Sequence, residues 1–181
     1  MTNIKNFQTY LFLSPQKFII SVNSNLDLKE LYLKEENNLN ETNQLDFKLI
    51  DEFLGKNIFE IEKKVKNFIN NINIIIQSKD FFIFKISIKK KNYGDIITKD
   101  KLVSLLIEAK DECKKTIGDR KLVHMIIDNY FIDDKKFSFF PHDLKCKNLS
   151  IDINFICLSK KYIIQIEKIL THVLSILTQD I

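Results

Sequence analysis

The chain has 181 residues, of which 45% are hydrophobic, and a formal net charge of +4 at pH 7. This length fits one compact domain or two small ones, and this apolar content is enough to bury a core. Arg120 is the only arginine, and sites that grip phosphates or read base edges favour the arginine fork, so we expect no nucleic acid as a partner. No uncharged apolar run approaches ~20 residues, so we expect no transmembrane segment.

Two β-rich runs open the chain, "QTYLFLS" (8–14) and "KFIISVN" (17–23). A proline and a glutamine separate them, which predicts a hairpin. Residues 28–34 predict a third strand. The polar, asparagine-rich residues 35–44 have no periodicity and predict a loop.

A helix is predicted over roughly 57–70, because apolar residues recur there at helical spacing. Its stripe consists of Ile58, Ile61, Val65, Phe68 and Ile69. The short apolar run 72–78 predicts a buried strand. Strict alternation of apolar and polar residues over 81–89 predicts a strand with one buried face.

The second half of the chain continues with a helix predicted over 99–115, for which Thr98 is the candidate N-cap. Residues 121–131 and 148–158 predict two more strands. From residue 159 the apolar period becomes helical again, and this closing helix carries a stripe that ends at Leu177.

Residues 121–136, "KLVHMIIDNYFIDDKK", gather a histidine, acidic residues and a tyrosine. In a strand, His124 and Asp128 share a face but lie about 13 Å apart at ~3.3 Å per residue, so they cannot share a metal ion. His142 and His172 have no acidic or cysteine partner at ligand spacing. The sequence therefore predicts no catalytic residue and no metal site.

The same strand is expected to place its other face on the helix predicted over 99–115, together with the strand predicted over 148–158. The expected contacts join Val123, Met125, Ile127, Ile151, Ile153 and Phe155 to Leu102, Leu106 and Ala109. Phe131 falls on this same face by alternation.

Nucleophile, metalloprotease and P-loop motifs are all absent from the sequence. With three glycines in the whole chain, a glycine-built phosphate cradle is difficult to make. We therefore expect that the chain is not an enzyme.

The order strand, helix, strand, strand over 79–158 is that of the SHS2 module. "ITKDKLVSLLIEAKDECKK" (97–115) resembles the I-[ST]-x-[ED]-[DE]-[VL] opening of the SHS2 helix in the bacterial cell-division family FtsA. "KLVHMIIDNYFIDD" resembles that family's R-x-[VL]-x-H-x-[IL]-[PD]-x-x-[YF]-x-[IV]-D segment. The residues at its characteristic positions are His124, Tyr130, Ile132 and Asp133. Pro141 and Leu144 match the N-P-x-G-x-x-G-x-x-L region that follows, but both its glycines are missing.

This resemblance implies an α+β fold. Residues 1–78 plus 159–181 would form part of an actin-like (ribonuclease H-like) subdomain, and residues 79–158 would be an inserted SHS2 domain. The two ends of an insertion should lie close together.

The family's phosphate hairpin reads D-I-G-T-[ST]-K, and the matching stretch is "FLSPQK" (12–17). Phe12 replaces the metal-associated aspartate and Ser14 replaces a glycine, so that only Lys17 remains as a vestigial phosphate contact. The family's second half has no counterpart in these residues. The resemblance thus implies no cofactor and no ATPase activity for this chain alone, with ATP and Mg²⁺ expected only where that second half is present.

For function, the resemblance implies a non-enzymatic cell-division adaptor. Its expected partners are further copies through FtsA-type self-association, FtsZ, and the cytoplasmic tails of membrane division proteins. Its expected location is the bacterial cytoplasm, including the cytoplasmic face of the inner membrane at the division site. Two alternatives stay open: an SHS2-bearing actin-like protein of another machine, such as PilM of type IV pilus assembly, and a diverged α+β ligand-binding domain.

The candidate contact surfaces are the sheet face away from the helix 99–115, the exposed side of that helix, and an unpaired strand edge.

Overall fold

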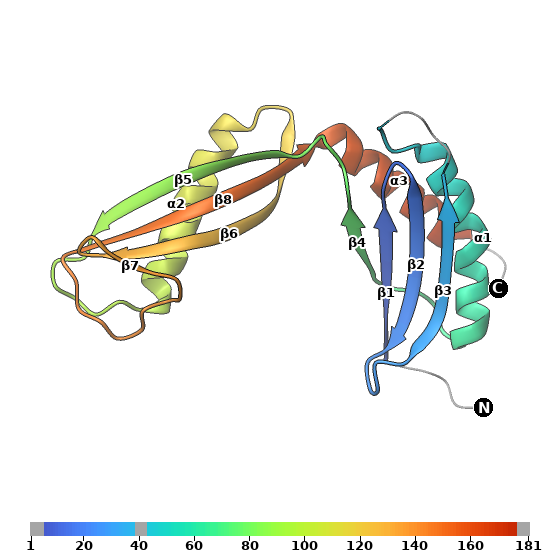
Figure 1. The fold of residues 1–181 in the computed structure, drawn as a ribbon, viewed down its shortest axis with the longest axis horizontal. Coiled ribbons are helices and arrows are strands. Elements are labelled where there is room, and N and C mark those ends of the chain that lie inside the picture. Colours follow the sequence, from blue (N-terminus) through green and yellow to red (C-terminus); the bar gives the residue numbers. More distant parts are fainter. Residues whose placement is uncertain (1–5, 39–42, 177–181) are drawn as a thin grey trace. The chain divides into compact units, whose positions relative to one another are not determined.

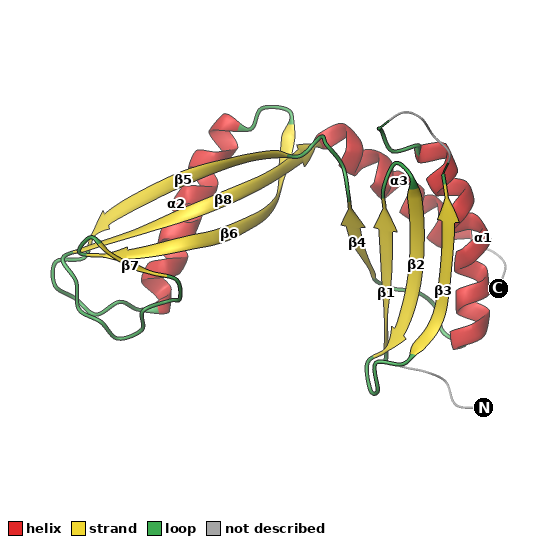
Figure 2. Ribbon diagram, in the orientation of Figure 1, coloured by secondary structure: helices red, strands yellow, loops and turns green. Residues whose placement is uncertain are grey.

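The computed structural model describes residues 6–38 and 43–176, and the chain divides into two compact units. Unit 1 comprises residues 1–79 and 164–181, and unit 2 comprises residues 80–163. Each unit contains a four-stranded sheet with helical cover on one face, so the fold is of the mixed α+β class (Figure 1, Figure 2).

The sheet of unit 1 has the strand order β3-β2-β1-β4. β1 pairs antiparallel with β2 and parallel with β4, and the predicted hairpin is confirmed. The four strands are β1 (Phe7–Leu13), β2 (Lys17–Ser24), β3 (Glu30–Asn37) and β4 (Ile72–Ile76).

β3 is longer at its end than the sequence predicted. Glu35 and Glu36 continue the ladder opposite Ile19 and Phe18, so the loop predicted from residue 35 was wrong over its first residues. Polar side chains are tolerated there because the strand lies at the edge of the sheet. Residues 39–42 of that predicted loop lie outside the described residues.

Helix α1 (Phe47–Val65) begins near residue 47 rather than residue 57. Asp46 caps it, because its carboxylate accepts the backbone N–H of Lys48 at 3.0 Å and of Leu49 at 3.1 Å. The helix ends where Lys66 adopts a left-handed conformation with φ of 56°. Phe68 therefore lies beyond the helix and is exposed, so its place in the predicted stripe was wrong.

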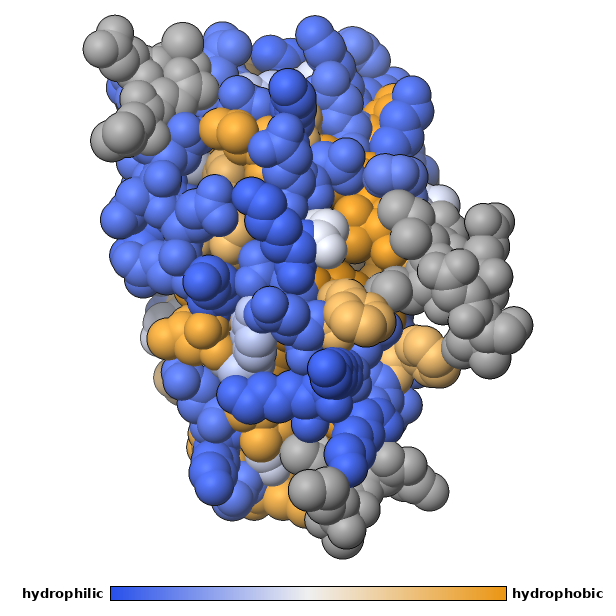
Figure 3. Space-filling view, turned by 90° about the vertical axis from the view of Figure 1, so that its right-hand side faces the viewer, coloured by the Kyte–Doolittle hydropathy of each residue, from blue (hydrophilic) through white to orange (hydrophobic). Residues whose placement is uncertain are grey.

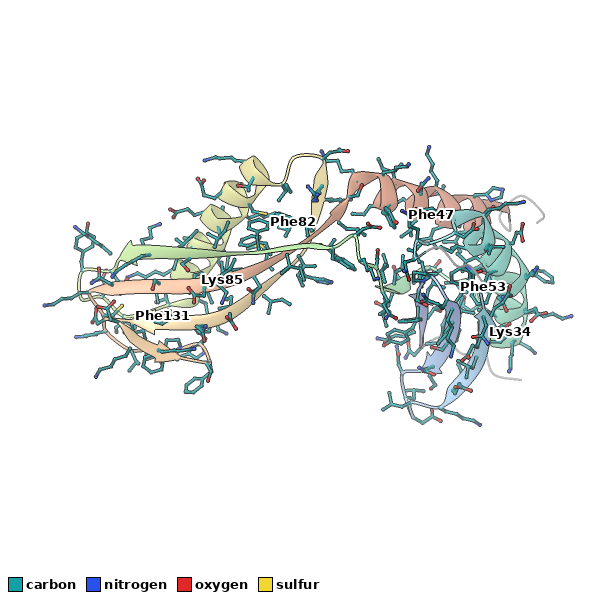
Figure 4. The ribbon with its side chains drawn as sticks, turned by 45° about the horizontal axis from the view of Figure 1, so that its top comes forward. Lys34, Phe47, Phe53, Phe82, Lys85 and Phe131 are labelled. Atoms are coloured by element: carbon teal, nitrogen blue, oxygen red, sulfur yellow. The ribbon has the colours of Figure 1, made fainter. Side chains whose placement is uncertain are left out.

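The core of unit 1 lies between α1 and one face of the sheet. Alternate residues of β1 and β2, among them Leu11 and Ile20, are fully buried, and Phe18 contacts Phe53 of α1 with ring centroids 5.8 Å apart (Phe53 is labelled in Figure 4). The opposite face of this sheet carries half-buried residues such as Phe12.

β4 was predicted to be buried, but it is an edge strand, and Ile75 is exposed. The predicted closing helix is confirmed as α3 (Lys160–Ile176), with Ile166 and Val173 buried. Leu177, assigned to its stripe, lies outside the described residues.

On the side that carries α1 and β3, hydrophobic residues are scattered among hydrophilic ones (Figure 3).

Unit 2 has the strand order β5-β8-β6-β7, and all pairs are antiparallel. The predicted order of strand, helix, strand and strand is confirmed, and the short β7 is an addition that the sequence did not reveal. Phe82 pairs with Cys157, so the two ends of this segment lie close together. The elements are β5 (Phe82–Lys91), α2 (Lys99–Thr116), β6 (Arg120–Ile132), β7 (Lys135–Phe137) and β8 (Asn148–Ser159).

The register between β6 and β8 shifts twice, once at Val123 and once at Asp128. Each β-bulge adds one residue and so inverts the alternation of faces. Val123 is 40% exposed, so its predicted core position was wrong, and Leu122 packs against the core instead.

After the second bulge the alternation of β6 inverts again. Tyr130 and Ile132 face the core in place of Phe131, which was also assigned to the wrong face. The other predicted contacts are confirmed, because the members of that set all belong to the core of unit 2: Met125, Ile127, Ile151, Ile153, Phe155, Leu102, Leu106 and Ala109.

Candidate protein-interaction surface

The turn between β1 and β2, which matches the phosphate hairpin of the resemblance, closes on itself. Ser14 is buried, and both its backbone N–H and its hydroxyl donate to the carbonyl of Lys17, at 2.9 and 3.0 Å. The backbone N–H of Lys17 in turn donates to the carbonyl of Ser14 at 3.4 Å. These donors are therefore occupied within the turn and are not turned outward toward an anion.

Lys17 forms an ion pair with Glu35 of the neighbouring β3. Phe12, at the position of the family's aspartate, lies on the uncovered sheet face opposite Ile19 and Ile75. Lys17 and Phe12 thus both take part in cross-strand contacts within the sheet.

A cavity of about 220 Å³ lies beside this turn, and Lys17 is not among its lining residues. Its lining is mostly neutral, with one lysine: Pro15, Gln16, Asn43, Gln77, Ser78 and Lys79. The side-chain amide of Gln16 donates to Asn43 Oδ1 at 3.4 Å. The cavity therefore offers little of the positive charge that is needed to hold a nucleoside triphosphate.

The three histidines have different surroundings. His124 is exposed on β6, and His142 packs edge-on against Phe140. His172 lies 3.2 Å from Asp51 of α1, an acidic partner that sequence spacing could not reveal because the two helices are far apart in the chain. Within residues 6–38 and 43–176, no group of three or more potential ligands could hold a metal ion.

Three of the residues that carry the SHS2 resemblance have structural roles in unit 2. Ile132 is buried in the core, and the ring of Tyr130 lies 5.7 Å from that of Phe140. Asp133 accepts the backbone N–H of Asn148 at 2.8 Å and of Lys147 at 3.0 Å, which ties the turn after β6 to the start of β8. These backbone donors lower the pKa of the Asp133 carboxyl.

The sheet face of unit 2 that α2 does not cover exposes an apolar patch. Ile83 pairs with Ile156, which pairs in turn with His124. Ile83 is 61% exposed and Ile126 is 50% exposed. We call the group formed by Ile83, Val123, Ile126 and Ile156 the open-face patch.

Polar contacts lie along one side of the open-face patch. Lys85 Nζ of β5 lies 2.6 Å from Asp128 Oδ2 of β6, so the pair spans the central strand β8 (Lys85 is labelled in Figure 4). Ser87 donates to Asp152 at 2.6 Å in the next row. The hydrogen bond from Lys85 lowers the pKa of Asp128, and the same bond raises the pKa of Lys85. An apolar centre with a polar border is the usual anatomy of a protein interface.

Sequence reasoning missed the pair between Lys85 and Asp128. Alternation already placed Asp128 on the face of His124, but its distance from Lys85 depends on the strand order β5-β8-β6 and on the register of these strands. These pairings join strands that are distant in sequence, so no local pattern predicts the contact.

The exposed side of α2 was also expected from the sequence to be a contact surface. Val103 and Ile107 are both more than half exposed on α2, one turn apart on its solvent side. The sole arginine, Arg120, lies over the ring of Phe82 at 4.8 Å and is thereby used within unit 2.

Comparison with known proteins gives a fold and no family. No protein-family model matches the chain, and no curated protein matches it. A solved structure of the PilM–PilN type IV pilus biogenesis complex is similar, with a TM-score of 0.50 and 8% sequence identity. The match covers 93% of this chain and 44% of that chain, so this chain spans less than half of the length of the similar protein. The likeness supports part of an actin-like fold.

No helix within the described residues is both long enough and apolar enough to cross a bilayer.

Proposed function

We propose that this chain is a non-enzymatic protein-binding component of an assembly machine, of the kind represented by the type IV pilus biogenesis complex. The observation that supports this most is the similarity to the PilM–PilN structure, which comes from a complex of two proteins and matches over 93% of this chain. In this proposal unit 1 is part of an actin-like subdomain, and unit 2 is the SHS2 domain inserted into it.

The cell-division function was the first expectation from the sequence, and the stretch from Lys121 to Asp134 favoured it over the pilus-type alternative. In unit 2, Tyr130, Ile132 and Asp133 serve packing and turn formation, so folding alone explains their presence. The similarity to the PilM–PilN structure therefore favours the pilus-type function over the cell-division function, in which FtsZ would be a partner.

The proposed binding site is the open-face patch of unit 2. Its isoleucines offer apolar area on a rigid sheet, and the pairs Lys85–Asp128 and Ser87–Asp152 give it a polar border. Hot spots of binding are usually apolar centres from which a surrounding ring excludes water. We infer a partner protein segment that packs apolar side chains on these isoleucines, beside the polar pairs.

Site-specific crosslinking in the native host tests this proposal. A photo-crosslinkable amino acid replaces Ile126, an exposed member of the patch, and in a matched control it replaces Lys56 on the exposed side of α1. The proposal expects a crosslinked product with a different protein from position 126 and none from position 56. Products of equal yield at both positions, or none at position 126, would overturn the proposed site.

The machine is identified by a separate observation. Fluorescent fusions and the neighbouring genes distinguish pilus assembly from division: pilus genes beside this gene support the proposal. Midcell localisation together with a cell-wall and division gene cluster would instead support a function in cell division.

A further inference from the structure

Each of the two sheets has a long edge strand, and these two strands carry opposite charge. β3 lies at one edge of the sheet in unit 1, and β5 lies at one edge of the sheet in unit 2 (Figure 1, Figure 2). Among the described residues, β3 pairs only with β2, and β5 pairs only with β8. An edge strand offers a row of backbone N–H and C=O groups that can pair with another chain.

β3 is acidic along this edge. Its sequence ELYLKEEN contains three glutamates and one lysine. Glu30 and Glu35 are exposed, and Glu36 is half-buried. Glu35 already pairs with Lys17, with both side chains more than a third exposed, so that solvent weakens the pair.

β5 is basic. Its sequence FIFKISIKKK contains four lysines and no acidic residue, and three of the lysines are the consecutive residues 89–91. Lys89 and Lys90 lie 3.4 and 3.5 Å from Asp134 and Glu108. All of these groups are more than half exposed, so a partner strand can compete for the lysines.

The charges decide which edges can meet. Two β5 edges repel each other, and so do two β3 edges, because like charges on facing strands are destabilising. A β3 edge and a β5 edge attract each other. β4 is the remaining edge of the sheet in unit 1, and its sequence INIII has no charge with which to select a partner. β7 is the remaining edge of the sheet in unit 2 and is also basic, but its three residues offer far fewer backbone groups than the ten of β5.

We propose that β3 of one copy pairs with β5 of a second copy, which extends one sheet into the next and joins copies of this chain. The two edges are different surfaces, so each copy has one of each to offer. The contact either continues from copy to copy or closes when two copies exchange both edges. This association is independent of the partner segment proposed for the open-face patch, which lies on a sheet face and not on an edge.

Sedimentation velocity at low ionic strength tests the proposal. The unaltered chain of 21.4 kDa should show a mean mass that rises with concentration and falls again when salt is added. A chain that stays at the monomer mass over the whole concentration range would overturn the proposal.

Charge reversal then identifies the edges. The variant E35K/E36K makes β3 basic, and the variant K89E/K90E/K91E makes β5 acidic. Each variant alone should sediment as a monomer, because its two edges then have the same sign. Mixed together, they should associate again, since the basic β3 of the first matches the acidic β5 of the second.

The control variant D111K/E112K changes the charge by the same amount as E35K/E36K, but on the exposed side of α2. It should associate as the unaltered chain does. Circular dichroism checks that every variant is folded. Association that survives both edge reversals, a mixture that stays monomeric, or equal loss in the control would each show that the edges do not carry the contact.

Discussion

The hydroxyl of Tyr32 on β3 donates a hydrogen bond of 2.7 Å to the amide oxygen of Asn57 on α1, inside unit 1. Both residues are buried, and the amide nitrogen of Asn57 donates to the carbonyl of Phe53 at 2.6 Å. The contact therefore joins the edge strand β3 to the helix through a largely buried hydroxyl, which also lies 3.0 Å from the carboxylate of Glu60 on the same helix.

The substitution Tyr32→Phe tests the weight of this contact. It leaves the oxygen of Asn57 without its donor, and a buried unsatisfied acceptor costs about 1–3 kcal/mol. We expect the free energy of unfolding to fall by that amount in denaturant titrations. As a control, Tyr93→Phe changes a residue that is 83% exposed, and surface substitutions stay within about 0.5 kcal/mol. Equal losses in the two variants would contradict the account.

The same tyrosine predicts a dependence on alkaline pH. Burial, followed by the hydrogen bond to Glu60, raises the pKa of Tyr32 to about 12 from an ordinary value of 10.0. Between these values the folded chain keeps a proton that the unfolded chain releases, so stability is lost as the pH rises from 10.0 to about 12.

This loss is smaller in Tyr32→Phe, because that variant has no proton to release at position 32. The difference in unfolding free energy between the two proteins should therefore narrow over this range. A difference that stays constant from neutral to alkaline pH would show that the pKa of Tyr32 is not raised. Tyr162, whose pKa burial also raises to about 12, affects both proteins equally.

The first bulge of β6 is tested by two neighbouring residues. Leu122 packs on the core of unit 2, whereas Val123 is exposed. Leu122→Thr should lower the free energy of unfolding by about 1–3 kcal/mol through lost burial. Val123→Thr should change it by less than about 0.5 kcal/mol. Strict alternation of β6 predicts the reverse order, so thermal or denaturant unfolding of the pair decides between the two registers.

These two residues also show what the sequence could and could not predict. The strands β5, β6 and β8 and the helix α2 follow from apolar periodicity, because each has one face on the core. The faces of β6 do not follow from it, because two bulges invert the alternation between Leu122 and Tyr130. A bulge is fixed by pairing with β8, which is distant in sequence, and not by local composition.

The start of α1 was missed for a different reason. Ile50, Phe53 and Leu54 continue the predicted stripe toward the N-terminus, and Asp46 is a good N-cap. That signal was present but lay next to an asparagine-rich stretch that resembled a loop. The open-face patch was predicted only as a sheet face. Its members come from three strands, and no local sequence pattern predicts the register between them.

The three thiols should be inert in the folded chain. Cys113, Cys146 and Cys157 are all buried, and burial raises the pKa of Cys113 to about 11. The thiolate is the reactive form, so both its access and its population are low. A chromogenic disulfide reagent should react slowly with the native protein and release three equivalents after unfolding. One equivalent released at the rate of a free thiol would contradict the burial of that cysteine.

The central claim is that this chain works through protein contacts and does not use a nucleotide. Calorimetric titration with Mg·ATP tests this claim most directly, because the turn at Ser14 uses its donors internally and Phe12 replaces a metal-ordering carboxylate. One contact from Lys17, on the order of 1.5–3 kcal/mol, cannot offset the cost of immobilising the ligand. We expect no binding tighter than about millimolar, whose free energy is about −4 kcal/mol. A micromolar Kd that Lys17→Ala abolishes in a folded variant would contradict the account.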